Sequence, residues 1–391
     1  MNIALIGQRF MGRAHSNAWT QVPHFFDVAL GPVLHTIAAR DGAGLEAFAR
    51  RWGWSRWTTD WRTIAADPEV GLVDIGTPND VHAEQAIAML EAGKHVACEK
   101  PLAGTLADAR AMRDAAKQAK RRGAQTFVWF NYRRCPAVAL AWRLVREGRL
   151  GRILHVRAHY LQSWGGPSTP ISWRFQRSRA GSGAHGDLNA HIVDMARFLV
   201  GREVEEVHGA IERTFVERRP VPGATRSGRA GSKPKTARSD VDDCVLFLAS
   251  FEGGATASFE ASRLAHGHQN DNSIELNGEL GSLRFAFEDM NLLWLAEASA
   301  SDGARTAGWR RIMCTSAEHH PYAASWWPDA HVLGYEHGFV NMAADVLRAL
   351  SGAEPEVPLC DFEDAYQTQR VLEAALASAR ARAAVKLSEI R

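Results

Sequence analysis

Two side chains that could move a proton lie four residues apart, after a glycine-rich stretch. Asp187 and His191 follow residues 181–184, Gly-Ser-Gly-Ala, which lead into a predicted helix. At this spacing the two side chains share one face of a helix. A histidine beside a carboxylate is suited to accept the proton of an alcohol while hydride leaves the carbon. The residues alone also allow a structural interpretation, in which Asp187 caps the helix and His191 packs at the surface.

A lysine that could join this pair follows a short predicted strand, residues 95–98. Lys100 stands two residues after the end of that strand, in the sequence Cys-Glu-Lys-Pro. Its ammonium can hydrogen-bond a substrate hydroxyl, and a positively charged nicotinamide nearby would favour loss of its proton. Because a lysine at a strand end is often only solvated, its catalytic role depends on whether Asp187 and His191 act with it.

The first strand-to-helix turn contains a dinucleotide-binding pattern. Residues 7–12 read Gly-Gln-Arg-Phe-Met-Gly directly after a predicted strand, residues 2–6. In this pattern the first glycine allows the tight turn and the last lets the helix pack against the strand. The middle glycine, where pyrophosphate meets the backbone, is replaced by Arg9, which either pairs with phosphate or weakens binding. We expect cofactor contacts from Gly7, Arg9, Phe10, Met11 and Gly12.

The choice between NAD and NADP depends on the end of the second predicted strand. An acid there binds the ribose hydroxyl of NAD, whereas a small residue with an arginine nearby accommodates the phosphate of NADP. The stretch is Ala38-Ala39-Arg40-Asp41, so Arg40 favours NADP, and Asp41 favours NAD if the strand ends later. The pattern leans slightly toward NADP.

Further cofactor contacts are expected where later strands end, because open α/β sheets bind ligands at the carboxyl ends of their strands. An ordinary turn before a helix is the alternative for the first of these segments. The expected contacts are Thr77, Pro78, Asn79, His82, Glu99 and Lys100.

The elements that would position these residues fall into two parts. Residues 1–130 alternate strands with helices, which predicts a doubly wound parallel sheet. After residue 131 the predicted strands follow one another without helices between them, which indicates an α/β domain with a large, mostly antiparallel sheet. We therefore expect a dinucleotide-binding domain at 1–130 and a substrate domain at 131–391. Residues 218–240, rich in basic residues, Gly and Ser, are expected to form a mobile loop.

Composition excludes several classes of protein. The chain has 391 residues, 46% of them hydrophobic, and a net charge of +2, so neither nucleic acid nor a membrane is an expected partner. Its five cysteines are scattered, which predicts neither a disulfide framework nor a zinc site, and we expect no metal. The apolar start is too short for a signal peptide, so a cytoplasmic location is expected.

Taken together, these motifs resemble the Gfo/Idh/MocA family, the glucose-fructose oxidoreductase and inositol dehydrogenase group. The residues that carry the resemblance are 7–12, Thr77-Pro78-Asn79, Glu99-Lys100-Pro101 and Asp187 with His191. The resemblance implies a Rossmann domain followed by an α/β domain whose open sheet serves oligomerisation, in a homodimer or homotetramer. It also implies Lys100, Asp187 and His191 as the catalytic set and a cis peptide bond before Pro101.

Within the family, the chain is most similar to members that oxidise an anhydrosugar such as levoglucosan at C3. That similarity implies substrate contacts from Tyr132, Arg134, Trp173, Arg174 and His185, although the arginines and Trp173 could equally be structural. The implied activity is NAD(P)-dependent oxidation of a secondary hydroxyl of a pyranose. An inositol or polyol dehydrogenase, a redox-cycling glycosidase of the same fold and a non-catalytic dinucleotide-binding regulator are the alternatives.

Overall fold

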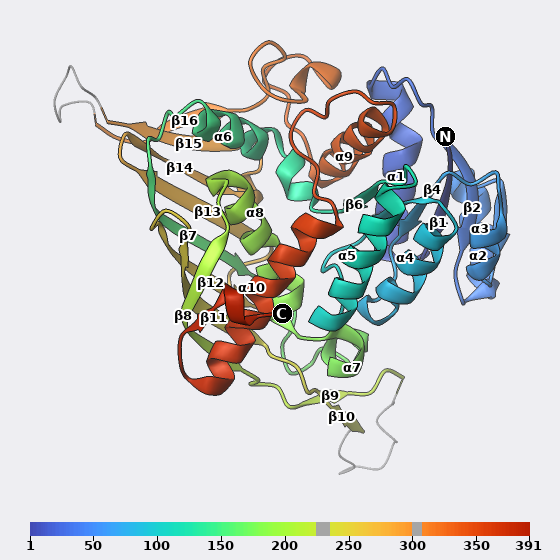
Figure 1. The fold of residues 1–391 in the computed structure, drawn as a ribbon, viewed down its shortest axis with the longest axis horizontal. Helices are drawn as coiled ribbons and strands as arrows, with labels where there is room; N and C mark the ends of the chain where they lie inside the picture. The colour runs from blue at the N-terminus through green and yellow to red at the C-terminus, as the bar shows by residue number, and fades with distance from the viewer. Residues whose placement is uncertain (224–234, 299–306) are drawn as a thin grey trace. The chain divides into compact units, whose positions relative to one another are not determined.

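A computed structural model describes residues 1–223, 235–298 and 307–391, and it divides into two compact units (Figure 1). The first contains residues 1–146, 290–293 and 311–367, and the second contains 147–289, 294–310 and 368–391. No helix of the described ranges is long and apolar enough to cross a bilayer. The basic residues Arg226, Arg229 and Lys233 of the expected mobile loop lie outside the described residues.

The first unit is built on a parallel sheet of six strands in the order β3-β2-β1-β4-β5-β6. The strands are β1 (Asn2–Ile6), β2 (Val33–Ala38), β3 (Arg56–Thr58), β4 (Leu72–Ile75), β5 (His95–Cys98) and β6 (Thr126–Val128). β1, β4 and β5 are short, mostly apolar runs, and β4 is buried at all its positions, whereas β3 at the edge of the sheet has no buried residue. The order reverses direction between β1 and β4, which is the switch point where doubly wound sheets bind ligands.

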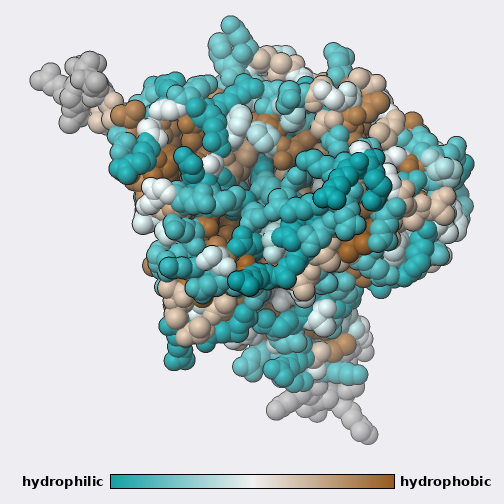
Figure 2. Space-filling model, viewed as in Figure 1, coloured by the Kyte–Doolittle hydropathy of each residue, from teal (hydrophilic) through white to brown (hydrophobic). Residues whose placement is uncertain are grey.

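Five helices of the first unit lie between the strands of this sheet in the chain, and α6 and α9 follow its last strand. They are α1 (Phe10–Phe25), α2 (Gly42–Trp52), α3 (Arg62–Ala66), α4 (His82–Glu91), α5 (Leu106–Lys120), α6 (Pro136–Arg146) and α9 (Tyr335–Leu350). In α5 the buried residues are Ala109, Met112, Ala116 and Ala119, and Thr105 caps its first turn. Figure 2 shows the face of the molecule that includes α5, and hydrophilic residues cover most of it. The predicted doubly wound sheet is confirmed, but β3 and α3 were missed because both are too short to show a period.

A mixed sheet of nine strands dominates the rest of the chain, in the order β16-β15-β14-β13-β7-β12-β11-β8-β17. Its strands are β7 (Ile153–Leu161), β8 (Val204–Arg213), β11 (Cys244–Phe251), β12 (Thr256–Ser262), β13 (Asp271–Gly278), β14 (Gly281–Ala286), β15 (Leu292–Glu297), β16 (Arg310–Met313) and β17 (Val385–Lys386). β7 and β12 are parallel, whereas β11 is antiparallel to β8 and β12, and β13 to β7 and β14. The predicted, mostly antiparallel sheet is confirmed.

One face of this sheet is covered and the other is open. Along β11, Val245, Phe247 and Ala249 are buried, whereas Leu246 and Leu248 are 38% and 58% exposed. The covering elements of the described chain include η4 (His185–Asn189) and α8 (Ala190–Val200). A strand whose outer face meets only solvent usually carries polar side chains on that face, whereas β11 carries leucines there.

The two ends of the expected loop at 218–240 are ordered strands. β9 (Arg218–Pro220) pairs antiparallel with β10 (Thr236–Arg238), and Arg219 is fully buried. The Arg219 guanidinium donates to Asp243 Oδ1 at 2.8 Å and lies 3.7 Å from the centre of the Phe175 ring. A buried charge with these partners explains why a segment of loop-like composition folds as a hairpin at its base.

Candidate active site

Two glycines bring β1, β4 and α1 into contact at the carboxyl edge of the parallel sheet. Gly7 has φ +125°, and a Cβ there would come within 2.6 Å of the Gly76 oxygen. A Cβ on Gly12 would come within 2.3 Å of the Gly7 oxygen. No residue with a side chain fits either position without moving the backbone, so the predicted roles of both glycines in the turn have a steric cause.

The start of α1 is suited to an anion. Arg9 precedes its first residue, no acidic residue lies in its first turn, and no side chain caps its amides. These amides and the Arg9 guanidinium, which is exposed, can therefore bind a pyrophosphate. The Phe10 side chain is 51% exposed and Met11 is half-buried. The residues of this turn fit a dinucleotide.

Strand β2 ends at Ala38, as predicted, so Arg40 and Asp41 stand in the turn before α2. Both side chains are exposed. The Gln8 side chain donates from Nε2 to the Asp41 main-chain oxygen at 3.1 Å, which links this turn to the glycine loop. A ribose bound at this edge could therefore meet either a cation or a carboxylate.

His82 connects two of the loops predicted to contact the cofactor. Its ring is fully buried, with Nε2 2.9 Å from the Thr77 oxygen and Nδ1 3.2 Å from the Pro101 oxygen. Burial lowers the pKa of His82, and its hydrogen bonds to main-chain oxygens oppose that shift. Thr77 itself donates to Gln85 Oε1 at 2.7 Å, and Asn79 is 9% exposed. With both ring nitrogens facing protein carbonyls, His82 is placed to hold the loops together.

Lys100 lies in the loop after β5, and the side chain of the preceding residue, Glu99, holds its main chain. The Lys100 main-chain N–H donates to Glu99 Oε2 at 3.1 Å, and Glu99 is 5% exposed. The peptide bond between Lys100 and Pro101 is cis, as the family resemblance implies. The Lys100 side chain is half-buried.

Behind this loop, His15 of α1 lies between two carboxylates. Its Nδ1 is 3.0 Å from Asp74 Oδ1, and its Nε2 is 3.0 Å from Glu99 Oε1. His15 and Asp74 are both 0% exposed. Burial by itself lowers the pKa of His15, but the charges and hydrogen bonds of Asp74 and Glu99 outweigh it and raise the pKa to about 9. His15 is therefore an imidazolium at neutral pH.

In the second unit, Asp187 and His191 lie on either side of a change in helix type. Asp187 belongs to the π-helical segment η4, and His191 lies in the first turn of α8. π-helical turns are frequent at functional sites because they redirect side chains within a helix. Asp187 Oδ2 accepts from the buried Arg263 at 2.9 Å, and the His191 ring lies 5.8 Å from that of Tyr160. The predicted helix is present, but it begins with a wider turn.

A buried carboxylate holds the glycine-rich lead into this helix. Asp242, which is 0% exposed, accepts from the Gly183 amide through Oδ1 and from the His185 amide through Oδ2, both at 2.7 Å. A Cβ on Gly183 would come within 1.8 Å of the main-chain oxygen of Asp242, so only glycine fits there. The carboxylate supplies acceptors for amides that the helix itself leaves without partners.

The predicted substrate residues have different surroundings. Trp173 and Arg174 are half-buried on the short helix η3 (Trp173–Phe175), where the Arg174 guanidinium lies 4.5 Å from the Trp173 ring. His185 is fully buried, with Nε2 2.8 Å from the Leu372 oxygen and Nδ1 2.9 Å from Asn189 Nδ2. Burial lowers its pKa, so a neutral ring with both nitrogens occupied favours a structural role.

Tyr132 and Arg134 lie in the short helix η2 (Asn131–Arg134) and are 5% and 0% exposed. The Arg134 guanidinium lies 3.3 Å from Asp345 Oδ2 and donates to the main-chain oxygens of Val357 and Pro358 at 3.0 Å. A buried arginine with these partners stabilises the first unit. Of the two alternatives for Arg134, the structure favours the ion pair.

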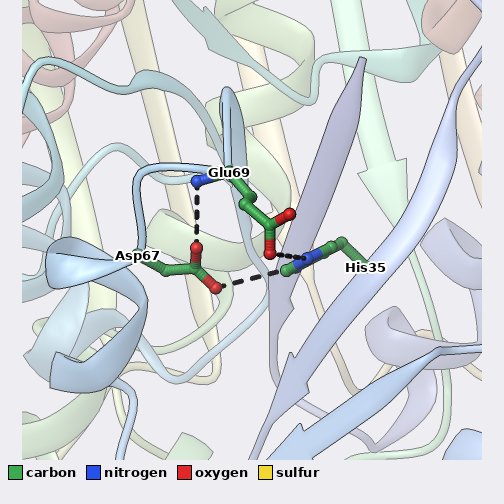
Figure 3. A group of neighbouring side chains, drawn as sticks. All are labelled: His35, Asp67 and Glu69. Atoms are coloured by element: carbon green, nitrogen blue, oxygen red, sulfur yellow. Dashed lines mark hydrogen bonds and ion pairs between the residues drawn. The ribbon is translucent and has the colours of Figure 1, made fainter.

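One further group of possible metal ligands lies away from these loops. Figure 3 shows His35 of β2 facing Asp67 and Glu69. Its Nδ1 is 3.9 Å from Asp67 Oδ2, and its Nε2 is 3.5 Å from Glu69 Oε2. The guanidinium of Arg56 already lies 3.5 Å from Asp67 and 3.1 Å from Glu69. Because that cation neutralises both acids, the group is better suited to an ion-pair network than to a metal.

Sequence reasoning missed His15, Asp74, Asp242 and Arg263. Asp74 carried a signal, because a carboxylate inside the apolar run Leu-Val-Asp-Ile requires buried partners. The partners of Asp242 and Arg263 are distant in sequence, and no local pattern identifies them.

Comparison with known proteins supports the class that this fold indicates, a nicotinamide-dependent oxidoreductase. The oxidoreductase family model with an NAD-binding Rossmann fold matches residues 1–127, and the GFO/IDH/MocA C-terminal domain model matches residues 138–284. Levoglucosan dehydrogenase of Pseudarthrobacter phenanthrenivorans is 43% identical over 100% of this chain and 99% of its own. The chain belongs to the Gfo/Idh/MocA family of oxidoreductases, as the motifs predicted.

Two solved structures are similar over nearly the whole chain. An oxidoreductase domain protein from Kribbella flavida has a TM-score of 0.91 and 48% identity, covering 98% of each chain. A levoglucosan dehydrogenase in complex with NADH has a TM-score of 0.90 and 41% identity, covering 99% of each chain.

The charge of His15 predicts a pH dependence of stability. Its pKa is about 9 in the folded chain and about 6.5 when unfolded, so its contribution is complete below about pH 6.5 and is lost as the pH rises through about 9. A pKa difference of this size corresponds to roughly 3 to 4 kcal/mol. Urea unfolding between about pH 6 and pH 10 should show a smaller loss of stability in His15→Gln than in the native chain. Equal losses in the two proteins would contradict the assignment of charge.

Proposed function

We propose that this enzyme, a sugar dehydrogenase, oxidises the C3 hydroxyl of a pyranose or anhydrosugar such as levoglucosan to a ketone. The observation that carries the proposal is the 43% identity to a levoglucosan dehydrogenase over the whole of both chains. A related structure contains NADH and levoglucosan, at 40% identity and a TM-score of 0.90. Lower-identity relatives include a scyllo-inositol dehydrogenase, so a polyol is the nearest alternative substrate.

In the proposed mechanism, a bound dinucleotide supplies the hydride acceptor. His191 accepts the proton of the reacting hydroxyl, Asp187 orients His191, and Lys100 hydrogen-bonds the same oxygen as carbonyl character develops. Asp187 is suited to its role because Arg263 fixes one of its oxygens at 2.9 Å. Trp173 and Arg174, both half-buried, are the proposed sugar contacts of the second unit. Tyr132 remains a proposed contact of the first.

The cofactor is expected to bind along the carboxyl edge of the parallel sheet. The glycine loop with Arg9, Phe10 and Met11 would hold the pyrophosphate, and the loops at Thr77-Pro78-Asn79 and Glu99-Lys100 would face the rest of the molecule. We propose NAD as the preferred form, because a relative 41% identical contains NADH. The early end of β2 and the exposed Arg40 are the features that favour NADP.

The assay that tests the activity is growth of reduced-nicotinamide absorbance with levoglucosan, other pyranosides, free sugars and inositols. Formation of a ketone, located at C3 by reduction with borodeuteride and mass spectrometry, is the expected result. If a glycoside is cleaved with no net reduced cofactor, the chain is a redox-cycling glycosidase. If cofactor binds and no sugar or polyol reacts, a regulatory role replaces the proposal.

Substitution of the proposed catalytic residues should separate chemistry from binding. In Lys100→Ala and His191→Ala, kcat should fall by about 100-fold or more, the usual scale for proton-transfer groups, while the Kd for NADH changes little. His319→Ala is the matched control, because that imidazole is 67% exposed and should leave kcat unchanged. A folded His191→Ala enzyme with native kcat would show that another group takes the proton.

Cofactor preference gives a separate test. The ratio of kcat/KM for NAD to that for NADP should be about 10 or greater, and Asp41→Ala should lower it by weakening contacts with the ribose hydroxyl. Arg40→Ala should impair use of NADP and leave use of NAD nearly unchanged. Asp27→Ala removes an exposed acid elsewhere and serves as the control. A native preference for NADP would identify Arg40 as the dominant residue of this turn.

We also propose that the open face of the nine-stranded sheet pairs with a second copy of the chain. Leu248 and Ile211, on β11 and β8, are 58% and 53% exposed on that face. Burial of such residues is a common source of affinity between subunits. Light scattering should give a mass of at least twice 43.0 kDa for the native chain and a lower one for Leu248→Glu. A monomeric native chain would remove this part of the proposal.

A further inference from the structure

His15 has an arrangement of partners that specifies its charge by geometry alone. Both of its ring nitrogens face carboxylate oxygens, at 3.0 Å each. Asp74 also accepts from the indole N–H groups of Trp19 and Trp129, at 2.7 and 2.9 Å, so its two oxygens face three donors. Since carboxylates accept and do not donate, both nitrogens of His15 must carry a proton.

Solvent is excluded from this group. The His15 ring stacks on that of Trp129 with 4.3 Å between centroids, and Phe339 of α9 lies at 5.7 Å. The titratable groups that face it are Asp74 on β4 and Glu99, directly after β5. Burial together with these two acids raises the pKa of the Cys98 thiol, at the end of β5. The His15 ring therefore lies between two carboxyl groups in a site closed by aromatic rings.

We propose that His15 is a positioning residue for Lys100, acting through the side chain of Glu99. His15 Nε2–H holds Glu99 Oε1, and Glu99 Oε2 accepts the main-chain N–H of Lys100 at 3.1 Å. Asp74 fixes His15 from the other side. The inference rests on the proposed function, because it takes Lys100 to be the residue whose position matters.

The position of the loop shows why such support is needed. The Glu99 amide donates to the Ile75 oxygen at 2.9 Å and continues the pattern of the sheet, whereas the next amide, of Lys100, turns to the Glu99 carboxylate. Pro101 has no N–H to continue the ladder. The direction in which Lys100 leaves the sheet therefore depends on how firmly the Glu99 side chain is held.

Removal of His15 would change this in two ways. Glu99 would keep the Lys100 amide at Oε2 but lose His15 at Oε1, and a buried carboxylate that loses a hydrogen-bonding partner is costly. The adjacent cation in sequence is the ammonium of Lys100, and an ion pair with it would draw that group away from a substrate oxygen. A displacement of about 1 Å at a reacting group can reduce the rate by about 100-fold.

The experiment compares His15→Gln and His15→Ala with Ser16→Ala. Ser16 is the adjacent buried residue of α1 and accepts from the Trp54 indole at 3.0 Å, so its loss removes a buried hydrogen bond without touching Glu99. We expect kcat to fall by about 10-fold in His15→Gln and by about 100-fold in His15→Ala, with the Kd for NADH within about threefold of the native value. The primary deuterium isotope effect on kcat should rise, because the chemical step becomes slower than product release.

Ser16→Ala should lower the unfolding midpoint and leave kcat and the isotope effect unchanged. The inference is overturned if folded His15→Gln keeps the native kcat and isotope effect, or if Ser16→Ala reproduces its losses. Should the His15 variants not fold, Glu99→Gln replaces them, since it weakens the same link, and native kcat in that variant is also contradictory. If Lys100→Ala remains active, the proposed function fails; if it is inactive while His15→Gln is active, only this inference fails.

Discussion

The first unit depends on a carboxylate inside its central sheet. Asp74 occupies the third position of β4, is 0% exposed, and accepts from His15 and Trp19 of α1 and from Trp129 just after β6. An unpaired charge at such a site would be too costly to bury, so these donors have to be in place for the strand to pack. The requirement connects α1, β4 and the end of β6, and these connections lie directly behind the loops that we expect to contact the cofactor.

The second unit also depends on a buried charge that needs partners, here the cation of Arg263. Arg263, 1% exposed, donates to the Gly183 oxygen at 3.0 Å and to Asp187 at 2.9 Å, and Asp242 accepts the amides of Gly183 and His185. The glycine-rich lead is therefore held by a buried cation at its carbonyl and a buried anion at its amides. Despite their glycine-rich composition, residues 183–185 have buried charged groups rather than solvent as hydrogen-bonding partners.

Local patterns were sufficient for the parallel sheet apart from β3, for the strands of the second sheet from β7 to β14, and for the glycine loop. Each depends on neighbours in sequence: short apolar runs in the first sheet, longer strand-like runs in the second, Gly7 before a helix and Lys100 after a strand. They could not specify which buried charges meet, since His15 and Glu99 are 84 positions apart and Arg263 and Asp187 are 76 apart. For the same reason, no local pattern distinguishes Arg134 as the partner of Asp345 from a substrate contact, or β9 from the loop composition around it.

This division between local and distant determinants bears on how one fold serves different substrates. The buried groups around Asp74, and separately those around Arg263, fix main-chain positions. Within each group the members are one another's partners, so a single substitution leaves a buried charge with fewer partners. Trp173 and Arg174, by contrast, are half-buried on a short helix, and their side chains lie against each other. Residues of that kind can change without loss of the fold. Such an arrangement permits one fold to serve several substrates, and the relatives of this chain include enzymes named for levoglucosan, apiose and inositol.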